Sequence, residues 1–458
     1  MTHPHPRRTV AALVAAATVA SLAGCAVGGA AEPSDPSDGE VTISVSNLPS
    51  TENPERRDAF LANVDAFEKA NPGVTVEPEE TVWAADTFQS LVAGGTMPTV
   101  FEVPFTEIGS VIAREQAANL SDYLADFEIL GDLNPAAQVA GENSDGDVFG
   151  IPVWSYTQAL IYNRALFEQA GLDPDAPPQT WEEVQDAAIA IEANTDAQGF
   201  MTMTTDNNGG WILTTMTNAF GSLMQSEDGT EVTIDNPAAQ EVLEWYDELR
   251  WEDNVFGTNF LINYDDGQNA MAAGQAGMYV NGSNSYSNLV INLGMDKEDF
   301  GLAPLPQTDN GLGTLGGGAF AIINPAATTA ELEAGLKWIE FNKFRKYVDE
   351  ETAVAQAKAA NEAGAAVGEP QFPVVGTALF DQWLTWVEPY VNVPRENFTL
   401  YNDTVEDLPL IPEPPVMAQQ LYAALDPIVQ AVLTQEDADI EALLAQANDA
   451  VQALVDAE

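Results

Sequence analysis

Hydrophobic positions at the start of the folded part of the chain alternate between the period of a strand and that of a helix. Residues 41–45 alternate apolar and polar side chains, which predicts a half-buried strand. Residues 55–70 repeat apolar side chains at helical spacing, and an Asn-Pro-Gly triplet at 71–73 ends that helix. The side chains expected on its buried face are Phe60, Val64 and Phe67.

The same alternation continues to residue 103. Residues 74–76 and 100–103 predict two further strands, and residues 87–93 predict a helix between them. Because parallel strands need helical crossovers, this order predicts that the opening part of the chain is α/β with a mainly parallel sheet. Ligands of such sheets bind beyond the carboxyl ends of the strands, so the loops after these strands are the places to look for binding residues.

Helical patterns dominate the later part of the chain. Thr180 and Glu183 form the pattern of a capping box at the start of a helix. Amphipathic helices are predicted over residues 237–251, 332–348 and 440–455. Three tryptophans on such patterns are expected in the core: Trp181, Trp245 and Trp338.

The first 40 residues have the features of a targeting segment and a tether. Two arginines precede an apolar run at 10–20, which is too short to span a membrane. Leu-Ala-Gly-Cys at 22–25 resembles the lipobox of bacterial lipoproteins, and the alternative is an ordinary signal with a chance cysteine. We therefore expect a signal peptide over 1–24, lipidation at Cys25 and a flexible tether over 25–40.

Charge and composition exclude several functions. The chain has 71 Asp and Glu against 15 Lys and Arg, a formal net charge of −56, and 45% hydrophobic residues. The apolar content is enough for a packed core, so the chain is not disordered. So few cations cannot line a nucleic-acid groove, and they disfavour a highly anionic ligand as well.

The chain has 2 His and 1 Cys, and all three precede residue 26. Cleavage before Cys25 would remove both histidines, and lipidation would block the thiol. This excludes Ser-His-Asp and Cys-His catalysis, zinc sites of His or Cys, and disulfides from the mature chain. We expect no cofactor and no metal.

Several segments, taken in order, resemble one family. They include DAFEKANPGVTVE at 65–77, AGGTMPTVFEV at 93–103, DGDVFGIPVWSYTQALIYNRALFEQAGL at 145–172, AAGQAGMYVNGS at 272–283 and TLGGGAFAIINP at 314–325. Together with the lipobox, they are similar to the extracellular solute-binding proteins of ABC importers, in the sugar-binding, maltodextrin-binding-protein-like class. The resemblance runs from about residue 41 to the C-terminus. An aromatic residue that many members carry shortly after Asn281-Gly282 is replaced here by Ser283.

The resemblance implies a two-lobed, periplasmic-binding-protein-like α/β fold with three crossing segments at a hinge and a ligand cleft between the lobes. The first lobe would comprise residues 41–152 and 304–347, and the second lobe residues 153–303 and 348–458. Ligand contacts to both lobes would then stabilise a closed state.

The function implied is a lipoprotein that captures a mono- or oligosaccharide by hinge closure and delivers it to a membrane permease. We expect no catalysis, no nucleic-acid partner, a monomer, and a location at the extracellular face of the cell membrane, anchored through Cys25.

A sugar cleft needs aromatic rings against C–H faces and Asp, Glu, Asn or Gln against hydroxyls. Three candidate groups belong to the first lobe and the crossing segments. Trp83 follows the second predicted strand, and Phe105, Thr106 and Glu107 follow the third. Trp154 and Tyr156 lie in the first implied crossing, next to the cleft.

The remaining candidates come from the second lobe and a glycine run. Trp211 follows a polar, glycine-rich loop and is implied to stack on the ligand. A second group ends a strand and is expected to line the cleft: Asn281, Ser283, Asn284 and Tyr286. Gly317 and Gly318 are expected to let backbone N–H groups approach the ligand, with a structural turn as the alternative.

Three alternatives stay open. The same fold could bind a polyamine or another small solute, because Asp and Glu beside aromatic rings also suit a cation. A surface glycoside hydrolase would use two of the many carboxylates. An adhesive or structural lipoprotein would show no closure on a small ligand.

Overall fold

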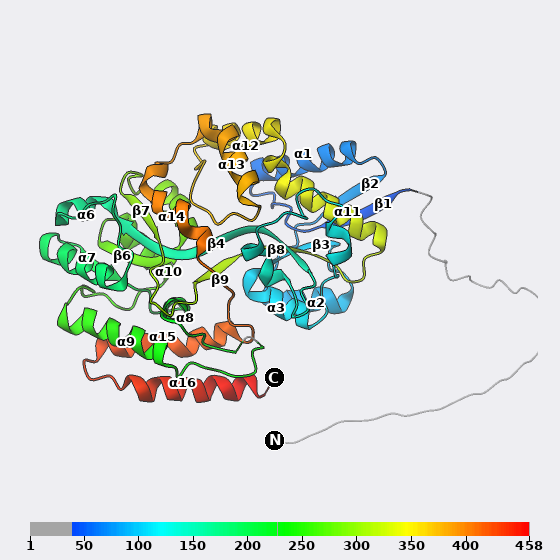
Figure 1. The fold of residues 1–458 in the computed structure, drawn as a ribbon. Helices are drawn as coiled ribbons and strands as arrows, with labels where there is room; N and C mark the ends of the chain where they lie inside the picture. The colour runs from blue at the N-terminus through cyan, green and yellow to red at the C-terminus, as the bar shows by residue number, and fades with distance from the viewer. Residues whose placement is uncertain (1–38, 227, 458) are drawn as a thin grey trace, which may run out of the picture. The chain divides into compact units, whose positions relative to one another are not determined.

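In a computed structural model that describes residues 39–226 and 228–457, the predicted strands join one mixed sheet (Figure 1). The order of its main path is β2-β1-β3-β8-β4-β6-β5, with β7 paired to β4 and β9 paired to β8. The strands are β1 (Val41–Val45), β2 (Val74–Pro78), β3 (Val100–Pro104), β4 (Gly150–Asn163), β5 (Gln198–Met201), β6 (Ala276–Gly282), β7 (Phe300–Pro304), β8 (Thr314–Ile323) and β9 (Leu410–Ile411).

Helices connect and cover these strands. The α-helices are α1 (Pro54–Ala70), α2 (Ala85–Gly94), α3 (Phe105–Ala113), α4 (Ser121–Leu124), α5 (Pro135–Gln138), α6 (Arg164–Ala170), α7 (Trp181–Asn194), α8 (Asn208–Phe220), α9 (Pro237–Asp247), α10 (Tyr264–Ala272), α11 (Thr329–Ile339), α12 (Glu350–Glu362), α13 (Thr377–Val387), α14 (Thr399–Thr404), α15 (Ala418–Thr434) and α16 (Ile440–Val455). Short 3-10 and π turns are η1 (Val139–Gly141), η2 (Glu248–Glu252), η3 (Ser283–Ser285), η4 (Ser287–Asn292), η5 (Glu340–Phe344), η6 (Arg345–Tyr347), η7 (Glu388–Tyr390), η8 (Arg395–Phe398) and η9 (Val405–Asp407).

The prediction of an α/β fold is confirmed, and so is the mainly parallel sheet predicted for residues 41–103, because β1 runs parallel to both β2 and β3. In the rest of the sheet only the β5-β6 pair of the main path is parallel. Strand β8 runs antiparallel to both β3 and β4, and β4 runs antiparallel to β6 and β7. The physical reason is the route of the chain. It leaves the first strands through β4 and returns through β8, so these two long strands run in opposite directions.

Strand β4 belongs to both halves of the sheet. Its first half, up to Thr157, pairs with β8, and its second half, from Gln158, lies between β6 and β7. The register shifts between Pro152 and Trp154, which marks a bulge in the first half of β4. This strand therefore carries the chain from one half of the sheet to the other.

The predicted helices form, and two of them give way to other turns before the predicted end. The 237–251 pattern gives α9 up to Asp247 and then the π turn η2, and the 332–348 pattern gives α11 up to Ile339 and then η5 and η6. Thr180 accepts the N–H of Glu183 as predicted, but the Glu183 carboxylate accepts the N–H of Gln179 rather than that of Thr180. Trp181, Trp245 and Trp338 are buried as predicted.

The C-terminal third divides between the two halves of the sheet. Helices α12 and α13 pack on each other and on η6, where the Trp383 ring lies 6.0 Å from that of Tyr347. Helix α14 packs on β7, and α15 packs on α8 and α16. The lobe boundaries stay a prediction, and these contacts favour placing α12 and α13 with the first lobe.

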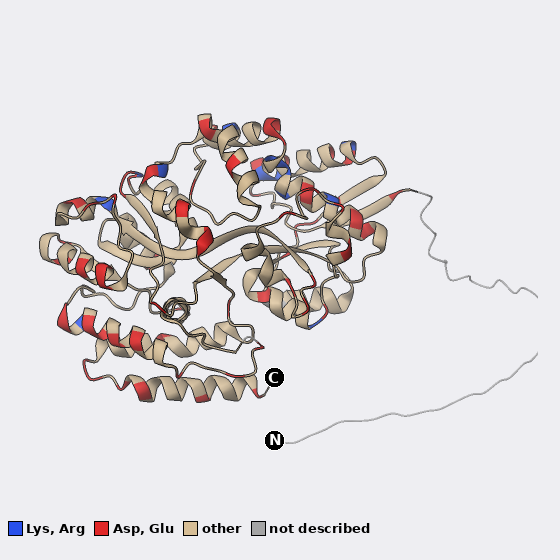
Figure 2. Cartoon of the chain, in the orientation of Figure 1, with Lys and Arg blue, Asp and Glu red and all other residues tan. Residues whose placement is uncertain are grey.

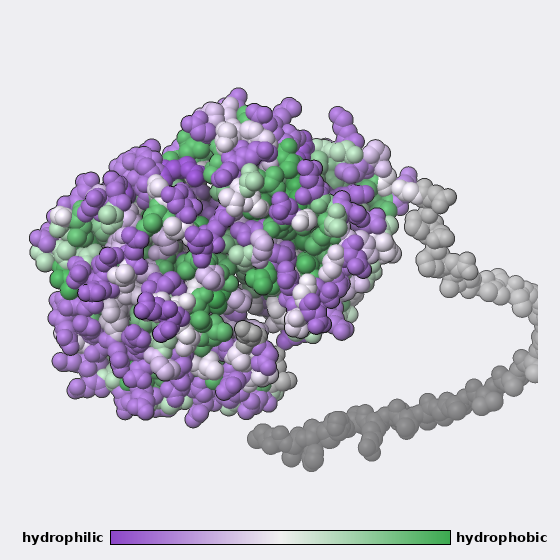
Figure 3. All heavy atoms as spheres, in the orientation of Figure 1, coloured by the Kyte–Doolittle hydropathy of each residue, from purple (hydrophilic) through white to green (hydrophobic). Residues whose placement is uncertain are grey.

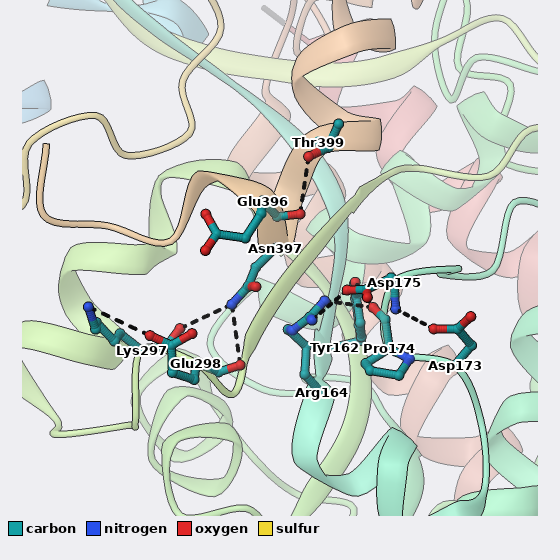
Figure 4. A network of polar contacts seen from close by, with 10 residues as sticks. All are labelled: Tyr162, Arg164, Asp173, Pro174, Asp175, Lys297, Glu298, Glu396, Asn397 and Thr399. Atoms are coloured by element: carbon teal, nitrogen blue, oxygen red, sulfur yellow. Dashed lines mark hydrogen bonds and ion pairs between the residues drawn. The ribbon is translucent and has the colours of Figure 1, made fainter. Parts of the chain in front are cut away.

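Two polar anchors fix loops at the far end of the second half of the sheet (Figure 4). Arg164 donates to the Pro174 carbonyl at 2.7 Å and pairs with Asp175 at 2.6 Å. The Asn397 side chain donates to the carbonyl of Glu298 at 3.2 Å, just before β7. These bonds hold the ends of β4 and β7 and lie outside the candidate site.

The charge excess is spread over the helices. Figure 2 shows acidic residues (red) on many helices and only scattered Lys and Arg (blue). Among the described residues, none of the helices combines the length and apolar character needed to cross a membrane. The predicted signal peptide, Cys25 and residues 25–38 of the tether lie outside the described residues.

Candidate functional site

Two aromatic side chains stand side by side on β4, where this strand pairs with β8. The rings of Trp154 and Tyr156 stack with centroids 5.8 Å apart and planes inclined by 23°. Trp154 is 46% exposed, whereas Tyr156 is only partly accessible. Figure 3 shows hydrophobic residues (green) reaching the surface near the middle of the molecule. An exposed tryptophan on an otherwise buried strand is unusual and points to a binding surface.

The glycine run of β8 makes room for Tyr156. Gly317 is the register partner of Tyr156, and a Cβ added to Gly317 would lie 2.3 Å from Tyr156 Cζ. At Gly318, φ is +144°, and an added Cβ would lie 2.1 Å from the Trp154 carbonyl oxygen. Gly317 and Gly318 both lie within β8. The alternative prediction for them, a structural turn, is therefore wrong.

Trp211 lies in the first turn of α8, and the loop before this helix is held by one carboxylate. Asp426 on α15 accepts the N–H groups of Asn207 and Gly210, each at 2.8 Å. Asn207 has a left-handed backbone, with φ of 70°. A Cβ on Gly210 would lie 2.2 Å from the Tyr422 carbonyl oxygen, so only glycine allows α8 to approach α15 this closely.

Glu413 joins Trp211 to Tyr156. It lies just after β9, close enough to the Trp211 side chain for Trp211 to lower its pKa, and its charge acts on Tyr156. Glu413 is only 7% exposed, and its Oε2 atom has no hydrogen-bond partner among the described residues. Burial raises the pKa of Glu413 to about 8. The Trp211 side chain has a smaller effect in the opposite direction and lowers this pKa.

A polar network lines the side of Tyr156 that faces β6 and α10. Tyr279 donates to the Gln268 side chain at 3.3 Å, and Gln268 donates to Ser285 at 3.4 Å. Tyr264, at the start of α10, hydrogen-bonds to Gln268 and Ser285 and is close enough to raise the pKa of Tyr156. Burial has the larger effect on the pKa of Tyr156 and raises it as well. Because the pKa values of Tyr156 and Tyr264 are both raised, both phenols are neutral at pH 7.

Buried polar atoms without a hydrogen-bond partner among the described residues lie on β4 and β6. They include both side-chain polar atoms of Gln158 on β4 and the Nδ2 atom of Asn281 on β6. These two strands are paired, with Gln158 opposite Gly282. Because buried polar atoms are normally satisfied, such a group marks a place where a ligand or water supplies the missing bonds.

Four of the predicted binding residues have buried side chains, and one of them is Asn281, which is 0% exposed. Phe105 packs on Phe320 with centroids 4.3 Å apart, and Tyr286 packs on Phe300 at 5.0 Å. The Ser283 hydroxyl accepts the Thr157 N–H at 3.3 Å and is buried. Their role in binding stays a prediction, and we do not carry them into the proposed site.

The other predicted residues are more accessible. Asn284 is exposed, and a Cβ on Gly282 would meet both Asn284 and Tyr156, so Asn284 borders the aromatic pair. Trp83 packs on the first apolar cluster, and its indole nitrogen is buried without a partner among the described residues. Thr106 and Glu107 lie in the first turn of α3, where burial raises the pKa of Glu107 and Arg114 opposes that shift.

The site thus brings together Trp154, Tyr156, Trp211, Gly317 and Gly318 from the predicted set. It adds Glu413, Tyr264 and Gln158, which the sequence interpretation missed. One pattern could have revealed Glu413: it is the single charged residue in the apolar, proline-rich stretch 408–416. Tyr264 and Gln158 have no comparable pattern, because both lie inside ordinary helix and strand sequence.

The arrangement can bind a solute and has no evident catalytic centre. Aromatic rings offer faces for C–H groups, and the carboxyl, amide and phenol groups offer hydrogen bonds. Among the residues that the structure describes, no Lys or Arg is a cause of the pKa shifts of Glu413 and Tyr156. In the described part of the chain, no group of three or more His, Cys, Asp or Glu side chains is arranged to hold a metal ion.

Comparisons with known proteins agree with this geometry. The family model "Bacterial extracellular solute-binding protein" matches residues 53–343, more than half of the chain. The sn-glycerol-3-phosphate-binding periplasmic protein UgpB of Salmonella typhimurium is 30% identical over 137 residues, which cover 28% of this chain and 31% of that protein. The aligned part therefore spans about a third of the length of this curated relative.

Solved structures match over nearly the whole chain. The cyclic alpha-maltosyl-1,6-maltose binding protein from Arthrobacter globiformis superposes with a TM-score of 0.69 at 22% identity, covering 92% of this chain and 100% of that one. UgpB from Mycobacterium tuberculosis, in complex with glycerophosphocholine, gives a TM-score of 0.67 at 18% identity, covering 91% and 99%. At these identities the likeness shows the fold, which is that of two-lobed solute-binding proteins.

Proposed function

The chain belongs to the bacterial extracellular solute-binding proteins, and from this membership we propose that it captures a carbohydrate for an ABC importer. Proteins of this family bind solutes and are not enzymes. The observation that carries the proposal is the stacked pair of the exposed Trp154 and the half-buried Tyr156, beside the buried Glu413. Stacked rings suit the C–H faces of a sugar, and the polar groups around them suit its hydroxyls.

A carbohydrate fits these residues better than a phosphate does. The curated relatives bind sn-glycerol-3-phosphate, so a phosphate ester is the rival ligand. Phosphate recognition relies on Arg, Lys or helix N-termini. The charge that acts on Tyr156 is instead the carboxyl group of Glu413, which would repel a phosphate if ionised.

Capture would proceed by closure of two lobes about the shared strand β4. We infer that Trp154 and Tyr156 meet the ligand from the crossing strand, and that Trp211 and Glu413 meet it from the side of α8 and α15. A ligand that contacts both lobes favours the closed state by the difference in its affinity for the two states. The closed form would then present the ligand to a membrane permease, with the binding protein acting as a monomer.

We also propose that a lipid on Cys25 anchors the protein to the cell membrane. Removal of Cys25 should release the protein from the cell surface, so a Cys25→Ser variant expressed in a bacterial host with a lipoprotein pathway should move from the membrane fraction to the soluble fraction. Incorporation of labelled fatty acid into the unmodified chain, and not into the variant, checks the same point. Membrane association that survives in the variant would contradict it.

A thermal-shift screen of the mature chain carrying Cys25→Ser tests ligand class. The panel holds neutral mono- and oligosaccharides, glycerol 3-phosphate, glycerophosphocholine and polyamines. A ligand at one hundred times its dissociation constant stabilises the folded state by about 2.7 kcal/mol. A shift with sugars, without product formation, supports the proposal. A shift confined to the phosphate esters or to the polyamines contradicts the carbohydrate assignment and keeps the solute-binding role.

A further inference from the structure

Glu413 lies in a short segment whose backbone is held on both sides. Before it, β9 pairs with β8, with Leu410 opposite Thr314. After it, the Val416 N–H donates to the Gln225 side chain at 3.0 Å. The residues flanking Glu413 are prolines at 412, 414 and 415, which fix φ and lack an N–H. The backbone next to Glu413 therefore offers its carboxyl group few donors.

The surroundings of Glu413 are aromatic and contain no described cation that acts on it. The Trp211 side chain lies close enough to the carboxyl group to affect its pKa, and Tyr156 on β4 lies within electrostatic reach. The next ionisable group is Tyr264 on α10, which raises the pKa of Tyr156. Both tyrosines are neutral at pH 7, so no neighbouring charge compensates an ionised Glu413.

A positively charged ligand group would supply what this carboxyl group lacks. An ammonium group has several N–H donors and a full positive charge, and it is attracted to the faces of tryptophan and tyrosine rings. It would meet the unpartnered Oε2 atom of Glu413 with Trp211 and Tyr156 beside it. A neutral hydroxyl would also bond to Oε2, but it would leave the aromatic faces without a cation.

We propose that Glu413 is a specificity-determining residue that selects a solute carrying a protonated amino group, so that the captured carbohydrate is an amino sugar or an amino-substituted oligosaccharide. This inference rests on the proposed function for its carbohydrate part. Its cationic part rests on Glu413 and its surroundings alone.

The test uses one matched pair of ligands that differ only at the nitrogen of each sugar, which is an ammonium group in one and a neutral acetamide in the other. Oligosaccharides of glucosamine carry ammonium groups, and the same oligosaccharides of N-acetylglucosamine are neutral. Binding of each to the mature protein carrying Cys25→Ser is measured by titration calorimetry at pH 7, in two buffers with different ionisation enthalpies. We expect the ammonium form to bind at least 10-fold more tightly than the acetylated form. We also expect its binding to release a proton, because an ammonium partner favours ionised Glu413.

Two variants separate the carboxylate from the shape of the site. Glu413→Gln keeps the size of the side chain and removes its charge, so it should lose at least 10-fold in affinity for the ammonium form. Glu369→Gln is the matched control, because Glu369 is a partly buried carboxyl group that binds Ser287 at 2.6 Å outside the site. It should keep the affinity. If Glu413→Gln fails to fold, proton release by the unmodified protein still decides.

The outcomes distinguish this inference from the proposed function. Equal binding of neutral and ammonium sugars, with Glu413→Gln unchanged, overturns the inference and leaves carbohydrate capture intact. Binding of spermidine alone, lost in Glu413→Gln, keeps selection of a cation and overturns the carbohydrate assignment. Failure of every amine in the panel to bind overturns the inference.

Discussion

Tyr156 lies so close to the backbone of Gly317 that a Cβ at position 317 would come within 2.3 Å of the tyrosine hydroxyl oxygen. The two residues are register partners on β4 and β8. The position of the tyrosine ring in the candidate site is therefore set by the absence of a side chain on the neighbouring strand. Three predictions about residues of the site and one about pH follow from contacts of this kind.

Gly317→Ala should displace Tyr156 and weaken ligand binding by about 10-fold or more, because the added methyl group and the ring cannot share the same space. Overpacking of this kind also costs typically 1–3 kcal/mol of folding stability. Affinity by calorimetry and unfolding by urea check both effects. Gly109→Ala in α3 is the control, because a Cβ there meets nothing within 4 Å. Retained affinity in Gly317→Ala would show that Tyr156 does not touch the ligand.

Trp154→Ala should reduce ligand affinity without loosening the fold. The side chain is 46% exposed, so its truncation should change the free energy of unfolding by only about 0.5 kcal/mol. A lost stacking contact of roughly 1.4 kcal/mol corresponds to a 10-fold weaker dissociation constant. Leu261→Ala, at another exposed apolar side chain, should change neither quantity. Unchanged affinity in Trp154→Ala would remove the aromatic pair from the site.

Asp426→Ala should damage both stability and binding. The carboxylate accepts two backbone N–H groups at the start of α8, and each bond to a charged acceptor contributes roughly 1.5–3 kcal/mol. Loss of these bonds frees the loop that positions Trp211. Chemical unfolding and ligand titration, each at pH 7, report the two effects. Asp228→Ala, which removes an acceptor in an exposed turn, serves as the comparison and should leave ligand affinity intact. A stable variant with normal affinity would contradict the prediction.

The stability of the protein should fall as pH rises toward 8, and Glu413→Gln should remove part of that fall. The pKa of Glu413 is raised from 4.5 to about 8 in the folded state. Between these values the folded state holds a proton that the unfolded state has lost, so raising the pH favours unfolding. The full effect is on the order of 5 kcal/mol.

Thermal or urea unfolding at pH 5 and pH 8.5 measures this linkage. We expect the stability of Glu413→Gln relative to the unmodified protein to be larger at pH 8.5 than at pH 5, because glutamine cannot ionise. A constant difference between the two proteins across this range would mean that Glu413 does not titrate as its burial requires.

The regular elements were predictable because their patterns are local. The helix over 55–70 appears as α1, and Val64 and Phe67 are buried as expected. The helix over 440–455 appears as α16 with the same ends. Periodicity of apolar side chains reports which face of an element is buried, whatever it packs against.

The direction of β8 was not predictable in the same way. Its residues read as a strand, but its antiparallel pairing with β3 and β4 depends on where the chain has travelled before it returns. Likewise, Phe105 and Tyr286 follow strands as binding residues do, and only packing against Phe320 and Phe300 places them in the core.

The sequence by itself determined the α/β class, the order of motifs that resembles the solute-binding family, and an aromatic pair at positions 154 and 156. The tertiary structure decided that Glu413 lies near Trp211 and within electrostatic reach of Tyr156, and that Glu413 is buried with an unpartnered oxygen. The physical reason is the separation along the sequence of the residues that interact. Helices and strands follow from neighbours in the sequence, whereas burial of a carboxyl group depends on segments that only the folded chain brings together.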